Sequence, residues 1–422
     1  MPFDPTPFAT SAPMGVLLAL GLFVIAFTLQ LFALRRLAPQ RLVGDEAEYL
    51  RIANGGPRST VWVRVPLGAA LLRPFRHWAA ADQIDAARLA NSAVSSLSVG
   101  LAAWCAFQAG GLAAGALAGA LLLISVERCI LAIHLWPDIL LGLWLLLFSQ
   151  AMRDPGSLPD MAVLGVIAAL GFLTRVDFLA LAVVAAPLAA LQDTAFWPSL
   201  CLVAGPTAAA VVGLSLWNGK RHGIWAPDTT ARFNLAVAAT EATHPQLTTS
   251  DLMQKTLAAA RGGTRGRTPP DRPVESLLRV AAGSLSLARR RLATLTGPET
   301  FVRQSLMSGN RAGYGPSHRV HIGGVIGLNL TGWSSCLLLA YLLMFHQHPP
   351  TLNLLIIVVV AVQSAVQTRS RYRMSLLPVL ATNVAVAICS GGAALPSWPG
   401  LMLALLFLGL LATTRPRAEV KT

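Results

Sequence analysis

Two adjacent carboxylates, Asp45 and Glu46, stand in the segment Gly44–Ala53 (GDEAEYLRIA), with Tyr49 close behind them. One carboxylate of such a pair can act as a general base on a hydroxyl group, while its neighbour orients that hydroxyl or holds a metal ion. Alternatively, Asp45 only N-caps a short amphipathic helix and Glu48 completes a capping box. The spacing leaves both interpretations open.

Further charged side chains border apolar segments. Asp138 follows His-Leu-Trp-Pro at the start of one such segment, where it could simply cap a helix. Arg175 and Asp177 stand between two short apolar runs in Phe172–Phe178 (FLTRVDF). Ionisable groups at such places are costly and usually face a partner or a wet cavity, so function is the first hypothesis and a mutual salt bridge the alternative.

Two basic segments could bind a phosphate group. Thr368–Pro378 (TRSRYRMSLLP) places Arg371 and Arg373 around a tyrosine, and Lys220 stands near the start of Trp217–Leu235 (WNGKRHGIWAPDTTARFNL). Arginine suits phosphate because its planar fork forms several charge-assisted hydrogen bonds. Anchoring of helix ends among lipid headgroups would explain both segments equally well.

Composition defines the elements that must position these residues. The chain has 422 residues, of which 54% are hydrophobic and 12% charged, and its mean hydropathy is +0.59, which is too apolar for a soluble domain. Runs such as Met14–Leu34 and Pro198–Trp217 have the ~20 residues that a helix needs to cross ~30 Å of hydrocarbon. They are apolar all round, which excludes the alternating strands of a barrel. We therefore expect an all-α, polytopic integral membrane protein.

Apolar runs and helix breakers predict about eleven transmembrane helices. They lie near residues 14–34, 89–109, 112–126, 138–152, 161–173, 178–191, 198–217, 322–345, 351–367, 374–393 and 398–414. The two longest connections, 35–88 and 218–321, emerge on the same face, so nearly every charged residue gathers there. We expect amphipathic interfacial helices in both, including Val274–Leu295 in the second, for which a solvated surface helix is the alternative.

The chain divides into three parts at these connections. Residues 1–217 form an N-terminal membrane module with a first catalytic loop at 35–88, residues 218–321 form a long loop, and residues 322–422 form the C-terminal transmembrane helices. The net charge of +14 lies mainly in the connections, where lipid phosphate is a nearer partner than nucleic acid. The five cysteines lack metal-ligand spacing, which indicates packing.

Taken in order, these segments resemble the GT-C superfamily of polyprenyl-phosphate-sugar-dependent glycosyltransferases, especially bacterial members related to protein O-mannosyltransferases and the lipid A aminoarabinose transferase. The similarity spans most of the chain. It is carried by GDEAEYL at 44–50, Arg88–Asn91, Gly110–Gly119, Asp138, Leu173–Arg175, Trp217–Pro227 and Arg371–Pro378. This chain departs from the family in having Asp138 where many relatives have Thr-Glu, Val176 where Pro usually follows the Arg, and Ser375 where Pro is common.

The resemblance implies a GT-C fold and transfer of a sugar, with inversion, from a polyprenyl-phosphate-linked donor to a hydroxyl of a glycan, lipid or protein. Asp45 would be the general base, and Glu46 and Asp138 would orient the acceptor or hold a divalent metal ion. That ion is the only cofactor that the resemblance raises. The candidates for binding the lipid phosphate and the sugar are Tyr49, Arg58, Arg175, Lys220, Arg371 and Arg373.

The resemblance also places the active face on the extracytoplasmic side of a bacterial inner membrane. Positive-inside counting gives the opposite orientation, because the connections on the other face contain little more than Arg153. We expect the outward orientation, since long loops weaken that rule. The alternative function is a transporter or flippase for a phosphate-bearing lipid, although transporters keep ionisable groups near the midplane, often in repeats. A non-catalytic scaffold is a third hypothesis.

Overall fold

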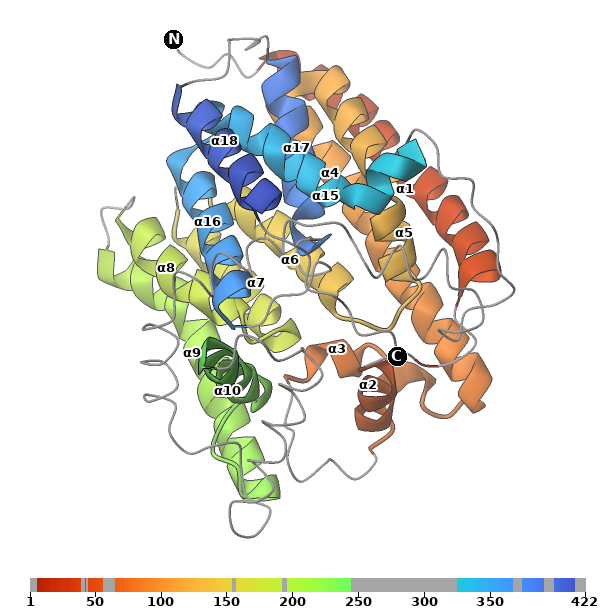
Figure 1. Ribbon diagram of the computed structural model, residues 1–422, viewed down its shortest axis with the longest axis vertical. Coiled ribbons are helices and arrows are strands. Elements are labelled where there is room, and N and C mark those ends of the chain that lie inside the picture. Colours follow the sequence, from red (N-terminus) through yellow and green to blue (C-terminus); the bar gives the residue numbers. More distant parts are fainter. Residues whose placement is uncertain are drawn as a thin grey trace.

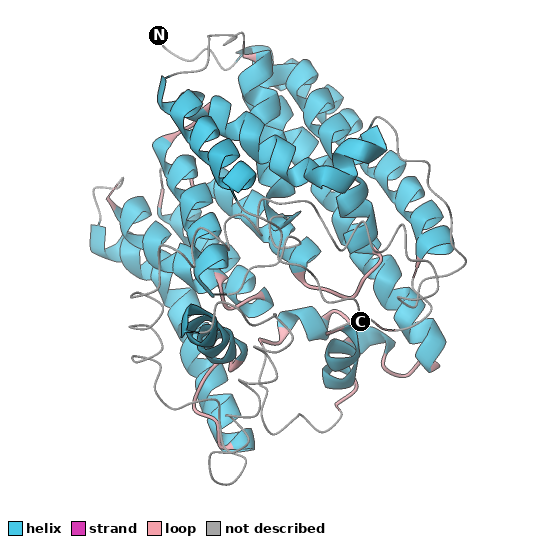
Figure 2. Ribbon diagram, in the orientation of Figure 1, coloured by secondary structure: helices cyan, strands magenta, loops and turns pink. Residues whose placement is uncertain are grey.

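The computed structural model describes residues 6–38, 42, 45–55, 65–153, 157–191, 196–243, 325–366, 374–390 and 398–413. Within these ranges the chain forms helices and their connections, and no strand occurs (Figure 2). The predicted all-α class is confirmed.

Three of the described helices are long and apolar enough to cross a membrane. They are α1 (Thr6–Leu37), α4 (Ala80–Leu123) and α9 (Phe196–His222). Within α4, Gly111 has φ 75° and ψ −170°, a conformation that only glycine adopts readily. A Cβ atom at Gly115 would lie 2.9 Å from the carbonyl oxygen of Ala103, whereas these residues would be ~18 Å apart along a straight helix. The chain therefore turns back at Gly111, as the two predicted spans 89–109 and 112–126 require.

Shorter apolar helices coincide with the other predicted spans (Figure 1). A helix of 14 residues, such as α6, rises only ~21 Å, less than the ~30 Å of hydrocarbon. Polar residues at its two ends can therefore lie near headgroup depth. The helices are α6 (Asp138–Ala151), α7 (Leu158–Thr174), α8 (Phe178–Ala190), α15 (Val325–Leu343), α16 (Pro350–Val366), α17 (Leu377–Cys389) and α18 (Trp398–Thr413).

Small helices gather at one end of the molecule, the lower end in Figure 1. In the first long connection they are α2 (Glu46–Ala53), α3 (Leu67–Ala70) and the 3-10 helix η1 (Arg73–Phe75), and α10 (Thr230–Thr243) follows α9. The short helix α5 (Val126–Ala132) leads from α4 towards the start of α6. The helix expected at Val274–Leu295 and most of the second long connection lie outside the described residues.

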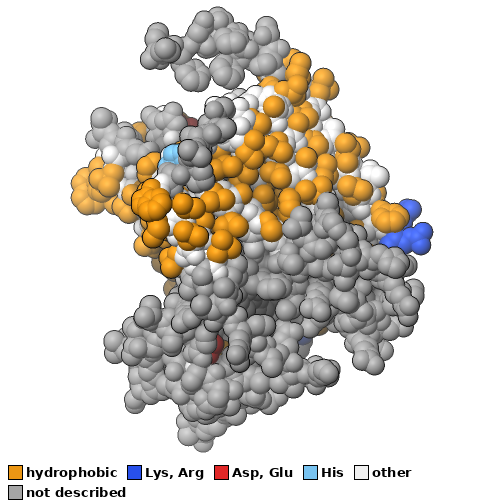
Figure 3. Space-filling view, turned by 45° about the horizontal axis from the view of Figure 1, so that its top comes forward, with side chains coloured by type: hydrophobic (Ala, Val, Ile, Leu, Met, Phe, Trp, Pro, Cys, Tyr) orange, Lys and Arg blue, Asp and Glu red, His pale blue; other side chains and the backbone are white. Residues whose placement is uncertain are grey.

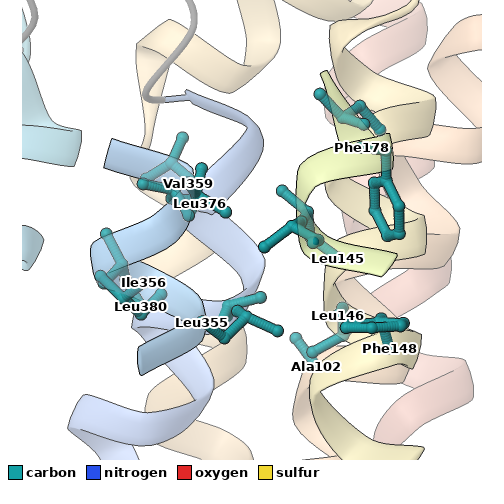
Figure 4. Packing of buried hydrophobic residues seen from close by; sticks show 14 of the residues in the cluster. Ala102, Leu145, Leu146, Phe148, Phe178, Leu355, Ile356, Val359, Leu376 and Leu380 are labelled. Carbon is teal, nitrogen blue, oxygen red and sulfur yellow. The ribbon is translucent and has the colours of Figure 1, made fainter. Parts of the chain in front are cut away.

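The hydrophobic core lies between helices from both halves of the chain (Figure 4). Leu145 of α6, Val359 of α16 and Leu380 of α17 are buried in one cluster, and the rings of Phe148 and Phe178 meet edge to face at 5.3 Å between centroids. The outer surface is also apolar: large hydrophobic side chains on α1, α9 and α18 are about half exposed or more. Figure 3 shows hydrophobic side chains gathered over one face of the molecule. A surface of this kind is stable against lipid rather than water. The chain is therefore a polytopic membrane protein.

Candidate active site at one end of the helices

Glu46 is a fully buried acid that joins two distant segments. Its Oε1 accepts a hydrogen bond from the backbone N–H of Leu135 at 2.8 Å and lies 2.9 Å from Nδ1 of His134, which is also fully buried. A buried carboxylate is stable only with such partners. The contact fixes α2 against the connection that leads into α6.

That connection is held from other sides as well. Nδ2 of Asn91, on α4, donates to the carbonyl oxygens of Ala132 at 3.2 Å and His134 at 2.7 Å. The rings of His134 and Trp136 stack at 4.4 Å between centroids and 10° between planes. Since both the backbone and the rings are restrained, Asp138 begins α6 at a defined position.

Asp138 is the first residue of α6, after the N-cap residue Pro137, and its side chain forms an ion pair. Its Oδ1 accepts from Nη1 of Arg175 at 2.6 Å, and its side chain is 1% exposed. Nε of Arg175 also donates to Oδ1 of Asp177 at 3.0 Å. The interpretation of Asp138 as only a cap was wrong, whereas the salt bridge between Arg175 and Asp177 does form. One guanidinium faces two carboxylates, which leaves a formal surplus of one negative charge.

Arg175 is positioned by the end of α7. Thr174, the last residue of that helix, accepts a hydrogen bond from Nε1 of Trp144 at 3.0 Å and donates one to the carbonyl oxygen of Leu170 at 2.9 Å. Arg175 then leaves the helix with extended backbone at φ −150° and ψ 133°. The indole of α6 thereby fixes the point where the ion triad Asp138, Arg175 and Asp177 begins.

Asp45 occupies the N-cap position of α2, but its side chain makes no capping hydrogen bond. Its backbone carbonyl accepts from the N–H groups of Glu48 and Tyr49, both at 3.1 Å. The side chain of Asp45 therefore does not form the capping box that was the alternative hypothesis. Asp45 is partly exposed, while its neighbour Glu46 is enclosed, so the buried residue holds the backbone of the accessible one.

Tyr49 lies in a small hydrophobic core beneath α2, and its side chain is 7% exposed. Leu72 and Leu135 belong to the same core. A Cβ atom at Gly68 would lie 3.4 Å from Cε1 of Tyr49 and 3.3 Å from Cβ of Pro137, so α3 passes close to both. In this arrangement the ring of Tyr49 positions α2; its predicted contact with substrate stays a prediction.

A shallow apolar cleft opens beside the ion triad. Most of its lining side chains are aliphatic or aromatic and come from α6, α8 and α16, while Asp177 and Gln363 provide polar groups. The lining residues are Leu141, Leu145, Asp177, Phe178, Leu181, Val358, Val359, Val362 and Gln363.

Asp228 is a further buried acid at this end of the molecule, and it is not among the predicted site residues. Its side chain is 6% exposed, and its Oδ2 accepts from the backbone N–H of Val65 at 3.1 Å. Nδ2 of Asn218 donates to the carbonyl oxygens of Ala226 at 2.8 Å and Pro227 at 3.2 Å, which shapes the turn before Asp228. The Pro-Asp pair after Gly-Ile-Trp-Ala was the sequence signal that could have pointed to Asp228. Its hydrogen-bond partner, Val65, lies 163 residues away in the sequence.

The structure describes one of the remaining predicted ligands. Lys220 is exposed near the end of α9. Arg58, Arg371 and Arg373 lie outside the described residues. The structure therefore brings Glu46, Asp138 and Arg175 into buried contacts at one end, beside Asp45.

No group of three or more His, Cys, Asp or Glu side chains is placed to hold a metal ion in the part of the chain that the structure describes. Glu46 already accepts from Leu135 and contacts His134, and Asp138 already accepts from Arg175. As arranged, these carboxylates do not fit a metal site. Metal dependence stays a prediction.

The fold and the site together define an all-α membrane protein with a carboxylate-rich polar site at one end of its helices. No protein-family model matches the chain, and a comparison with curated proteins finds no match. Among solved structures, the chain is similar to the archaeal oligosaccharyltransferase AglB from Archaeoglobus fulgidus in complex with an inhibitory peptide and a dolichol-phosphate. The identity is 14%, the TM-score is 0.43, and the match covers 94% of this chain and 54% of that one, so this chain spans about half of that protein's length.

Proposed function

We propose that this protein is a membrane glycosyltransferase that moves a sugar from a polyprenyl-phosphate-linked donor to an acceptor hydroxyl, with inversion, at the extracytoplasmic face. One observation carries the proposal: buried contacts gather Asp45, Glu46 and Asp138 at one end of the helices, beside an apolar cleft. A lipid-linked donor needs apolar walls for its chain and polar groups for its head.

Asp45 is the general base in this proposal. Its carboxylate takes the proton of the acceptor hydroxyl, and the acceptor oxygen attacks the anomeric carbon. The bond between that carbon and the phosphate oxygen breaks, and polyprenyl phosphate leaves with the electron pair. The partial exposure of Asp45 supports this role, because the base must reach the acceptor.

Glu46 and Asp138 have different tasks. Glu46 is fully buried against His134 and Leu135, which makes it a positioning residue for Asp45. Asp138 lies in the ion triad, where it orients Arg175 and contributes negative charge near the acceptor.

The leaving phosphate needs positive charge. Arg175 already faces Asp138 and Asp177, so it is poorly suited to neutralise a further anion alone. Stabilisation of the phosphate therefore falls to Arg371 and Arg373, in the connection between α16 and α17. α16 also lines the apolar cleft.

The test is a comparison of Asp45→Asn with Asp85→Asn, a matched change at an exposed acid in the first turns of α4. Lipid-linked sugars and glycans are compared in cells that carry each variant, with the amount of protein in membranes as a control. We expect Asp45→Asn to abolish transfer while the protein still accumulates, and Asp85→Asn to transfer normally. Transfer at a near-normal rate by Asp45→Asn would remove Asp45 as the base.

The same experiment distinguishes a flippase. A flippase would move the lipid-linked sugar across the membrane without transferring the sugar, so it would need no general base. Asp45→Asn would then leave the glycan products unchanged, because a separate enzyme would carry out the transfer. Reporter fusions after Arg58 and after Arg153 test the orientation. A cytoplasmic signal from the first fusion would overturn the extracytoplasmic placement.

A further inference from the structure

A second polar cluster lies at the opposite end of the same helices. Arg153 follows α6 by two residues, while Asp138 begins that helix. Nη2 of Arg153 donates to Oδ1 of Asn383, on α17, at 2.7 Å. Burial, and then the positive charge of Arg153, lower the pKa of His348, which precedes α16 by two residues.

His348 is enclosed by aromatic and amide groups. Its ring stacks on that of Tyr341 at 4.2 Å between centroids and 7° between planes, and its side chain is 7% exposed. The hydroxyl of Tyr341 donates to Oδ1 of Asn353 at 2.7 Å, and Nδ2 of Asn353 donates to the carbonyl oxygens of Phe345 at 3.0 Å and His348 at 3.4 Å. α15, α16 and the turn between them thus hold the imidazole in one place.

Two buried nitrogen atoms of this cluster have no hydrogen-bond partner among the described residues: Nε of Arg153 and Nε2 of His348. Arg153 also has no carboxylate partner there, since its contact is with the neutral amide of Asn383. Leaving a buried donor unsatisfied is costly, and Nε of Arg153 belongs to the charged guanidinium of a half-buried side chain. The described residues therefore offer this cluster no acceptor that carries negative charge.

We propose that Arg153 and His348 form a binding site for a phosphate group, supplied by an anionic phospholipid headgroup or by free phosphate. Both residues lie at the ends of apolar helices, at a depth where lipid phosphates are the nearest anions. The guanidinium fork binds phosphate oxygens through Nε and an Nη group. The neutral imidazole donates its Nε2–H to another oxygen, and Asn383 holds the guanidinium in position.

The site lies away from the proposed chemistry and goes beyond the proposed function. It joins α6, α15, α16 and α17, and the cleft at the acidic end lies between α6, α8 and α16. A bound phosphate at the far end would hold α6 and α16 in register.

The experiment uses the full-length protein in nanodiscs. One set contains phosphatidylcholine with phosphatidylglycerol, and native mass spectrometry counts the phosphatidylglycerol that the protein retains. A second set contains phosphatidylcholine alone, and the midpoint of thermal unfolding is measured with and without inorganic phosphate at constant ionic strength. The variants are Arg153→Gln and His348→Asn, and the matched controls are Arg36→Gln and His346→Asn, at two exposed side chains.

We expect Arg153→Gln to weaken phosphate binding roughly ten- to a hundredfold, the usual effect of losing a charge-assisted hydrogen bond. His348→Asn should weaken it less, and both controls should behave as the native protein. A difference only in retained phosphatidylglycerol identifies the lipid as the source, and a difference only in the response to inorganic phosphate identifies the free ion.

The proposal is overturned if neither phosphatidylglycerol nor phosphate distinguishes the native protein from the two variants. If Arg153→Gln does not accumulate, the comparison of His348→Asn with His346→Asn decides in the same way. Catalytic transfer is not the readout, so failure of the glycosyltransferase proposal would leave this result intact.

Discussion

Two half-buried arginines lie at the two ends of α6, and their charges are satisfied in opposite ways. After α7, Arg175 reaches the start of α6 and faces the carboxylates of Asp138 and Asp177. After the other end of α6, Arg153 faces the amide of Asn383 and no carboxylate within the described ranges. The first arrangement is closed by the chain itself, whereas the second is open to an anion from outside.

The two arrangements suit different tasks: the ion triad positions helices, and the cluster around Arg153 can bind an anion. Removing one member of a closed buried pair leaves an uncompensated charge, so the pair strongly restrains its two elements. A guanidinium without a carboxylate partner restrains the neighbouring helices less, but it can still bind an anion. We therefore expect variants at the acidic end to affect stability and transfer together, and variants at the opposite end to affect mainly ligand binding.

The largest effect should follow Glu46→Ala. This change leaves His134 and the N–H of Leu135 buried without their partner. We expect the free energy of unfolding to fall by about 3–5 kcal/mol and sugar transfer to be lost. Glu46→Gln keeps an acceptor oxygen and should cost less. Unfolding is followed in detergent, with Asp85→Ala as the control. Native stability of Glu46→Ala would show that the contact with His134 does not hold α2.

Arg175→Met should lower the free energy of unfolding by about 3 kcal/mol, because Asp138 is left buried without its cation. The double variant Arg175→Met/Asp138→Leu removes both charges and should recover most of that loss, but not transfer. Unfolding and transfer are measured on the same preparations. Recovery of transfer in the double variant would contradict a role for Asp138 at the acceptor.

Arg153→Gln should change the free energy of unfolding by only about 1 kcal/mol in phosphatidylcholine without inorganic phosphate, since one hydrogen bond to Asn383 is lost and no buried carboxylate among the described residues loses its cation. The measurement is the same unfolding experiment. A loss as large as that of Arg175→Met would mean that the cluster around Arg153 is closed by an ion pair, and the comparison between the two ends would fail.

The smallest effect concerns pH. Burial, and then the charges of Arg153 and His346, lower the pKa of His348 from 6.5 to about 4. The unfolded chain therefore takes up a proton at this side chain before the folded chain does, so stability falls as the pH drops through this interval. The midpoint of thermal unfolding should fall more in the native protein than in His348→Asn, with His77→Asn, at an exposed histidine elsewhere in the chain, as the control. If the unfolding midpoint changes equally with pH in the native protein and in His348→Asn, His348 does not contribute to the pH dependence of stability.

Much of the fold could be predicted from the sequence because hydropathy is local. Each apolar run either contains enough residues for a membrane helix or does not, and the all-α class follows from the need to satisfy backbone groups inside lipid. The turn at Gly111 was visible as a break between two apolar runs. The acids at 45, 46 and 138 were likewise visible as charges at the borders of such runs.

The partners of those acids were decided by the tertiary structure. Glu46 meets His134 across 88 residues, Asp138 meets Arg175 across 37, and Arg153 meets Asn383 across 230. Which of these residues meet depends on which helices lie side by side. Helix packing in lipid depends on the shapes of the helix surfaces rather than on a pattern within one segment. The sequence alone determined where charge borders the membrane helices; only the assembled helices decided which charges are paired and which remain open.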